Sequence, residues 1–180
     1  MGLSSIASPV GFGFDGQTYD LQLISESSIN SDLSINSETG EVTLAVNPDY
    51  ETESEYSFSV IATDAAGNVS DSQDVTVTVN NLDEVAPTIT SGDAVSIDEN
   101  SGAGQVVYTA TADDSADISA GVIFSLSEDS DTALSIDSAT GEVTLAADPD
   151  FEAQSQYSFT VIATDAAGNA SEPQSVTLDI

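Results

Sequence analysis

The chain has 180 residues, 32 of them Asp or Glu, no Lys, Arg or His, and a formal net charge of −32. Phosphate contacts need basic side chains, so the composition excludes nucleic acid as a natural partner and disfavours docking on anionic membranes. The absence of Cys removes disulfides and thiolate metal sites. Because 39% of the residues are hydrophobic and alternate along short runs, we expect a folded chain whose self-repulsion is relieved by water, salt or bound cations.

The beginning of the chain carries no targeting pattern. Met1–Ser5 lack a charged region and a long apolar core, so we expect any export signal to lie outside this fragment. No apolar run approaches the roughly 18 residues that a membrane helix needs, so we expect no membrane insertion.

Strand patterns separated by turn signals follow up to about residue 82. Leu33–Ile35 predicts a short strand, and Ser37–Gly40 fits a hairpin turn in which Gly takes a positive φ. Tyr56–Ala62 alternates apolar and polar residues and predicts a strand with one buried face. Asp64–Asn68 predicts a tight loop, and Val75–Val79 predicts the last strand of this part.

A short acidic connector, Asn80–Pro87, joins this part to a second one. Pro87 fixes its own φ and pushes Ala86 towards extended geometry. A flexible tether would instead be rich in Gly and Ser. We therefore expect a stiff connection, followed by a new strand pattern at Thr88–Thr90.

The second part contains short strand patterns separated by turn signals, with no convincing helical pattern between them. About seven such strands in some 95 residues predict a Greek-key β-sandwich. Tyr157, Phe159, Val161 and Ala163 share one predicted face, so we expect these aromatic side chains, like Tyr56 and Phe58 in the first part, to lie in the core and not to bind sugar. The predicted strands are Ala94–Asp98, Gln105–Ala112, Val122–Ser127, Leu134–Ile136, Glu142–Leu145, Tyr157–Asp165 and Gln174–Ile180.

The two parts are copies of each other at an offset of 101 residues, the distance from Gly40 to Gly141. Val60–Asn68 recurs without change as Val161–Asn169. A period of this length is a whole small domain. We therefore predict an all-β protein of two tandem Greek-key, cadherin- or Ig-like β-sandwiches placed end to end, residues 1–82 and 83–180.

The first domain is predicted to be incomplete at its N-terminus. The counterpart of Val95–Asn100 would fall before residue 1. The sequence leaves open whether Leu3–Ile6 replaces that strand, and an unpaired edge there could exchange a strand with a neighbour.

Carboxylates are the abundant reactive groups, and a few recur at fixed places. Asp49-Tyr50-Glu51 recurs as Asp150-Phe151-Glu152. In an extended segment the two acids of such a triplet point to one side and the aromatic residue to the core. Asp113-Asp114, Asp64 and Asp165 follow predicted strand ends. Hard oxygens of this kind suit Ca²⁺, whereas zinc would require His or Cys.

These motifs together resemble a cadherin repeat and are most similar to the bacterial cadherin-like repeats in the extender region of large surface adhesins of the RTX type. The resemblance covers nearly all of the second domain and the first domain after about Leu21. It is carried by Ile97–Asn100 with Gly104, Asp113-Asp114, Ser135–Asp137 with Thr140-Gly141, Asp150–Glu152, and Tyr157–Asp165 with Gly168.

The resemblance implies β-sandwiches with Ca²⁺ clamped between successive domains. Carried over by position, it assigns to the join between the two domains Asp49, Glu51, Asn81, Asp83, Glu84, Asp113, Asp114 and Asp165. It assigns Glu99, Asp150 and Glu152 to a join with a following domain and Asp64 to a join with a preceding one.

Three departures from the family pattern leave the number of ions open. The first domain lacks the strand that would supply its own Glu. The connector reads Asp83-Glu84-Val85 where the family commonly shows Asn-Asp-Asn. Asp113-Asp114 are adjacent where the family favours Asp-x-Asp.

The resulting hypothesis is a non-catalytic calcium-binding extender module of a bacterial surface adhesin, extracellular, whose partners are the neighbouring repeats of the same polypeptide. Two alternatives remain open: an Ig-like spacer without metal, and a module that makes glycan or homophilic contacts. Paired carboxylates can hydrolyse glycosides, but the chain has no His, Lys, Cys or G-x-S-x-G motif, so we do not expect an enzyme.

Overall fold

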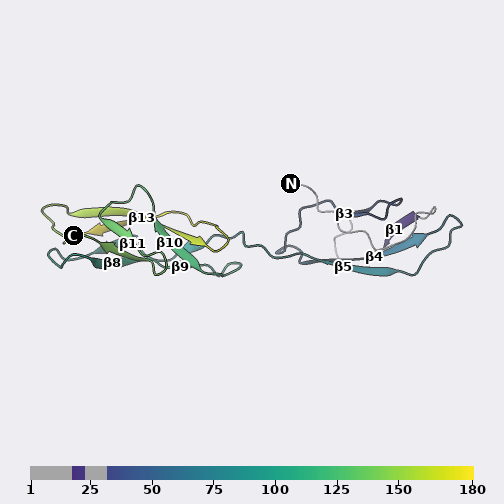
Figure 1. Cartoon of the computed structure of the whole chain (residues 1–180), viewed down its shortest axis with the longest axis horizontal. Helices are drawn as coiled ribbons and strands as arrows, with labels where there is room; N and C mark the ends of the chain where they lie inside the picture. The colour runs from purple at the N-terminus through teal and green to yellow at the C-terminus, as the bar shows by residue number, and fades with distance from the viewer. Residues whose placement is uncertain (1–17, 23–31) are drawn as a thin grey trace. The chain divides into compact units, whose positions relative to one another are not determined.

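The computed structural model describes residues 18–22 and 32–180, which form β-strands, turns and loops (Figure 1). The chain divides into two compact units, unit 1 (Met1–Leu82) and unit 2 (Asp83–Ile180). Within the described ranges no helix is long and apolar enough to cross a membrane. The all-β, sandwich-like architecture confirms the predicted fold class.

The described residues of unit 1 form an antiparallel sheet of three strands and a hairpin. The sheet has the order β1 (Thr18–Gln22), β4 (Glu55–Thr63), β5 (Gln73–Thr78), and the hairpin pairs β2 (Leu33–Ile35) with β3 (Val42–Leu44). The alternating residues of β4 point their apolar side chains towards the hairpin. The buried core of the described part of unit 1 consists of Leu33, Val42, Tyr56 and Phe58.

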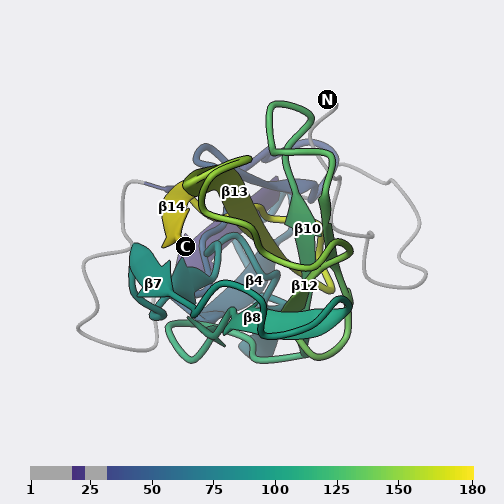
Figure 2. The same ribbon diagram turned by 90° about the vertical axis from the view of Figure 1, so that its left-hand side faces the viewer.

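Unit 2 is built from nine strands in two main sheets and a short pair. One sheet has the order β10-β13-β14-β7, with β7 parallel to β14, and the other has the order β11-β12-β8, while β6 pairs with β9. Figure 2 shows β13 and β14 on one side of unit 2 and β8 and β12 on the other. The strands are β6 (Thr88–Ile89), β7 (Ala94–Ser96), β8 (Gln105–Thr109), β9 (Ala112–Asp113), β10 (Val122–Leu126), β11 (Leu134–Ile136), β12 (Glu142–Leu145), β13 (Gln156–Asp165) and β14 (Gln174–Asp179).

The core of unit 2 lies between its two main sheets. Tyr157, Phe159, Val161 and Ala163 of β13 are all buried, as their alternation predicts. Phe159 meets Tyr108 of β8 edge to face, with ring centroids 5.4 Å apart. The prediction that the aromatic residues of β4 and β13 belong to the core is therefore confirmed.

The predicted strand Gln105–Ala112 is confirmed for its first five residues and is interrupted at Ala110 and Thr111. β8 ends at Thr109, the amide of Ala110 donates to the carbonyl of Gly141, and the chain then moves over to pair β9 with β6. Gly141 has a φ of 73°, and a Cβ built there would collide with the Ala110 carbonyl oxygen. The position of Gly141 therefore requires glycine, because the backbone of Ala110 lies against it where β8 ends.

The described strands of unit 1 match strands in the second half of unit 2. β1 pairs with β4 as β10 pairs with β13, and β4 pairs with β5 as β13 pairs with β14. Leu3–Ile6, the segment considered as a replacement for the first strand, lies outside the described residues.

Candidate metal centres

A turn at the end of β13 fixes one carboxylate firmly. Asp165 is the last residue of β13, and its Oδ1 accepts hydrogen bonds from the amides of Gly168 (2.7 Å) and Asn169 (2.8 Å). The Asn169 side-chain amide donates to Oδ2 at 2.8 Å. Burial raises the pKa of Asp165, but the hydrogen bonds from Asn169 and Gly168 outweigh it and hold the pKa below its ordinary value. Asp165 is therefore held in one orientation by hydrogen bonds that favour its ionised form.

The same turn holds the connector. The Asn169 Nδ2 atom also donates to the backbone carbonyl of Asp83 at 2.9 Å. Both hydrogens of this amide are then engaged, one on the connector and one on Asp165. Asn169 therefore places Asp83 beside Asp165 although the two residues are far apart in sequence.

The Asp83 carboxylate lies in an environment that favours a cation. Neither of its oxygens has a hydrogen-bond partner in the described chain, although both are buried, and the same holds for Oδ2 of Asp114. Burial, then the negative charges of Asp165, Asp114 and Asp117, raise the pKa of Asp83, and the nearby amide of Val85 offsets this only in part. Buried carboxylate oxygens without donors are costly unless a cation neutralises them.

The adjacent acid pair contributes unequally, and sequence reasoning missed one residue. Asp113 is exposed at the end of β9 and accepts a hydrogen bond from the amide of Ser115. Asp114, one residue later, is half-buried, and its negative charge raises the pKa of Asp83. The charge of Asp117 also raises the pKa of Asp83, and Asp117 is not among the predicted site residues. The only signal for it in the sequence is its closeness to Asp113-Asp114, in a loop without periodicity.

Asp83 and the three acids whose charges raise its pKa, Asp114, Asp117 and Asp165, offer only oxygen atoms as ligands. Ca²⁺ takes 6–8 oxygen ligands in flexible geometry, and Mg²⁺ requires a stricter octahedron. The orphaned oxygens of Asp83 and Asp114 thus fit Ca²⁺ by chemistry and by charge.

A second acidic centre lies at a different place in unit 2. Glu99, Asp150 and Glu152 each bring one carboxylate oxygen to within 4.8 Å of the others, and all three side chains are exposed. The turn that carries Glu99 is held against the other two acids by two hydrogen bonds. The amide of Asn100, at φ 57°, donates to the carbonyl of Pro149, and the amide of Gly102 donates to Oδ1 of Asp148, both at 2.8 Å.

The recurring triplets are turns, so the expectation of an extended segment with a buried aromatic residue is wrong. Tyr50 is 41% exposed and Phe151 is 52% exposed. Oδ1 of Asp49 accepts from the amides of Glu51 (3.1 Å) and Thr52 (3.3 Å), and this pattern bends the chain. The hydroxyl of Thr52, and then its amide, hold the pKa of Asp49 below its ordinary value.

The remaining predicted residues occupy separate places in their units. Asp64 follows β4 in unit 1, where the side-chain and backbone amides of Asn68 hold its pKa below the ordinary value. Asn81 follows β5 and is half-buried, whereas Glu84 precedes β6 and is exposed.

The sequence signature of the family described as "Cadherin domain" matches residues 17–80 and 93–180, most of the chain. The chain belongs to the cadherin family. No curated protein matches its sequence.

Solved cadherin structures share the fold of this cadherin. Human protocadherin-24 EC1-2 is similar with a TM-score of 0.68 and 22% identity, over 92% of this chain and 81% of that one. Mouse clustered PcdhgC3 EC1-3 is similar with a TM-score of 0.63 and 18% identity, over 90% of this chain and 55% of that one. At these identities the similarity concerns the fold.

Proposed function

We propose that this cadherin is a calcium-binding, non-catalytic extender module in which Ca²⁺ stiffens the join between the two units. The observation that carries the proposal is the pair of buried Asp83 oxygens, which no hydrogen bond of good geometry reaches and which the Val85 amide stabilises only in part. Their charge adds to that of three further acids in the same unit, so the centre is self-repelling until a divalent cation binds. A bound Ca²⁺ would supply the positive charge that offsets the repulsion among these acids.

The acidic residues of the chain would then belong to three calcium sites. Asp83, Asp114, Asp117 and Asp165 would hold the ion from unit 2, Asp49 and Glu51 would complete its shell from unit 1, and Asn81, Glu84 and Asp113 would lie around it. Glu99, Asp150 and Glu152 would form the corresponding half-site towards a following domain, and Asp64 towards a preceding one. Family membership supports this assignment, because cadherin domains bind Ca²⁺ in general.

The location that suits this function is the cell surface, because cadherin domains are extracellular modules. The sequence resemblance to bacterial RTX-type adhesins supports a place in the extender of such a protein, between the cell and an adhesive part. In that setting the neighbouring repeats of the same polypeptide are the partners, and the acids serve structure and not hydrolysis.

Calorimetric titration with Ca²⁺ and small-angle X-ray scattering of the full chain test the proposal. We expect Ca²⁺ binding in the wild type and an affinity at least about tenfold lower in Asp83→Asn. Scattering should show a narrower range of particle dimensions in Ca²⁺ than in EDTA. Asp129→Asn, an exposed acid in the loop after β10, is the matched control and should behave as the wild type. Identical scattering after complete chelation would overturn the proposal.

A further inference from the structure

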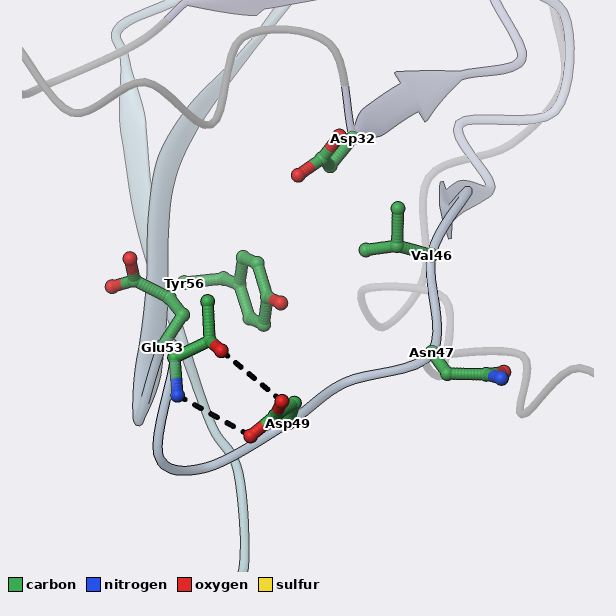
Figure 3. Close-up of a pocket in the computed structure, with 7 residues that line it drawn as sticks. Asp32, Val46, Asn47, Asp49, Glu53 and Tyr56 are labelled. Atoms are coloured by element: carbon green, nitrogen blue, oxygen red, sulfur yellow. Dashed lines mark hydrogen bonds between the residues drawn. The ribbon is translucent and has the colours of Figure 1, made fainter.

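Unit 1 contains a hollow of about 300 Å³ beside the start of β4. Figure 3 shows Asp32, Asp49 and Glu53 around it, with Val46 on the side facing Tyr56. Asp32 immediately precedes β2, and the other acids come from the loop between β3 and β4. The hollow therefore combines three carboxylates with an aromatic ring and an aliphatic wall.

The phenol of Tyr56 is directed into this hollow. Its residue is 5% exposed, its ring projects between the surrounding acids in Figure 3, and its hydroxyl makes no hydrogen bond with the described part of the chain. Burial, then the charges of Asp32, Glu53 and Asp49, raise the pKa of Tyr56. A phenol that keeps its proton leaves its hydroxyl available to a ligand, while the ring of Tyr56 belongs to the core of unit 1.

The hollow has one more acid than the matching place in unit 2. At the offset of 101 residues, Asp32 corresponds to Ala133, so unit 1 has a carboxylate where unit 2 has a methyl group. Glu53 corresponds to Gln154, whose side-chain amide donates to Oδ2 of Asp131 at 2.9 Å and to the carbonyl of Gln156 at 3.0 Å. The residue that corresponds to Asp131 is Asn30, so this acid–amide pair is exchanged between the units and adds no net charge.

The spacing of the acids favours an organic cation over a metal ion. Elsewhere Glu99, Asp150 and Glu152 converge to within 4.8 Å, but the three acids of the hollow do not form such a group. A Ca²⁺ ion requires converging oxygens at about 2.3–2.6 Å. A planar guanidinium presents five donors over a wider area and stacks on aromatic faces. The whole chain contains no Lys, Arg or His, so the cation must come from another molecule.

We propose that this hollow binds the guanidinium group of an arginine side chain presented by a partner protein. The carboxylates of Asp32 and Glu53 accept its hydrogens, the hydroxyl of Tyr56 lies at the inner end of the hollow, and the exposed side chain of Val46 covers its apolar stem. This site is independent of calcium, apart from Asp49, which lies at its rim.

The test is an NMR titration of the full chain in saturating Ca²⁺ with a short peptide containing one arginine, followed on the Tyr56 ring signals. A peptide with citrulline in place of arginine is its neutral control. We expect the arginine peptide to shift the Tyr56 signals and the citrulline peptide to leave them unchanged. The double variant Asp32→Asn with Glu53→Gln should weaken binding by about tenfold or more.

The matched double variant Glu38→Gln with Asp71→Asn removes two exposed charges away from the hollow and should bind like the wild type. If it weakened binding as much as the hollow variant, the interaction would be diffuse attraction to an acidic chain, and the proposal would fail. A stronger effect of spermidine than of the arginine peptide on Tyr56 would identify a free polyamine as the source and overturn the partner assignment. The calcium affinity of the hollow variant reports separately on the proposed function.

Discussion

Two loops of identical sequence differ in what they hold. Asp64–Asn68 in unit 1 and Asp165–Asn169 in unit 2 make the same turn, with the backbone amide and side-chain amide of the Asn bound to the Asp carboxylate. In unit 2 the Asn also holds the Asp83 carbonyl, and Asp165 is only 5% exposed. Asp64 is half-exposed, and Asn68 has no such further bond in the described residues.

The difference shows that the turn depends on local hydrogen bonds, whereas the proposed metal centre depends on a contact between distant residues. The turn is local, because every hydrogen bond in it spans four residues or fewer. The centre is not local, because Asp83 and Asn169 are 86 positions apart. Matching substitutions in the two loops should therefore have similar effects on the stability of the turn. They should have different effects on the affinity for Ca²⁺.

The largest disagreement is expected at the aspartates. Asp165→Ala removes a proposed ligand and should lower Ca²⁺ affinity at the join by more than about 100-fold, whereas Asp64→Ala should leave it within about twofold. Both variants should lower the melting temperature in EDTA, because each loses the hydrogen bonds of its own turn. Calorimetric titration and thermal melts of both variants measure this, and equal losses of affinity would contradict the distinction between the turn and the metal centre.

The asparagines should show a smaller difference of the same kind. Asn169→Ala removes the contact that positions Asp83, and loss of such a supporting contact typically costs about 10–100-fold in metal affinity. Asn68→Ala removes only the turn bond to Asp64 and should not change the affinity. Exchange of the Val85 amide, measured by NMR without Ca²⁺, should accelerate in Asn169→Ala alone, which distinguishes a loosened connector from general destabilisation.

The pH dependence of stability should separate Asp83 from the two loop aspartates. The pKa of Asp83 is raised above 3.8 in the folded chain, so its contribution to stability is present below that value and is lost as the pH rises through the folded pKa. The pKa values of Asp64 and Asp165 are lowered, so their contributions are present above 3.8 and are lost as the pH falls. Asp83→Asn should therefore raise the melting temperature in EDTA near neutral pH, and this gain should vanish at about pH 4. A gain that persists at low pH would assign the effect to packing and not to charge.

The sequence predicts the parts of this molecule that are local or periodic. The alternation of β13 identifies its buried face, and Gly40 and Gly141 take the positive φ expected of their turns. The triplets were misread because a side chain that bonds the amides two and three residues ahead makes a turn of a segment that otherwise looks extended. Pattern alone does not distinguish these two states.

The parts that escaped prediction depend on contacts between distant residues. Gly141 lies against the backbone of Ala110 where β8 ends, and the periodicity of the sequence does not predict that contact. Asp117 joins the charged centre from an irregular loop, where side-chain direction does not follow from spacing. The family resemblance assigned acids by their place in the repeat motifs, and Asp117 belongs to none of these motifs.

The smallest expected effect is an equal loss of stability when the same glycine is replaced in each loop. This comparison tests whether the two turns are equivalent. Gly67 and Gly168 have φ values of 88° and 98°, and a Cβ added at either position meets no atom within 4 Å. Alanine there introduces only backbone strain, so Gly67→Ala and Gly168→Ala should each lower the free energy of unfolding of their own unit by about 1 kcal/mol. Urea denaturation in EDTA, followed by NMR signals of each unit, measures both. A clearly larger loss at Gly168 would show that the stability of this turn depends on the connector. The two identical loops would then differ already in their local hydrogen bonding.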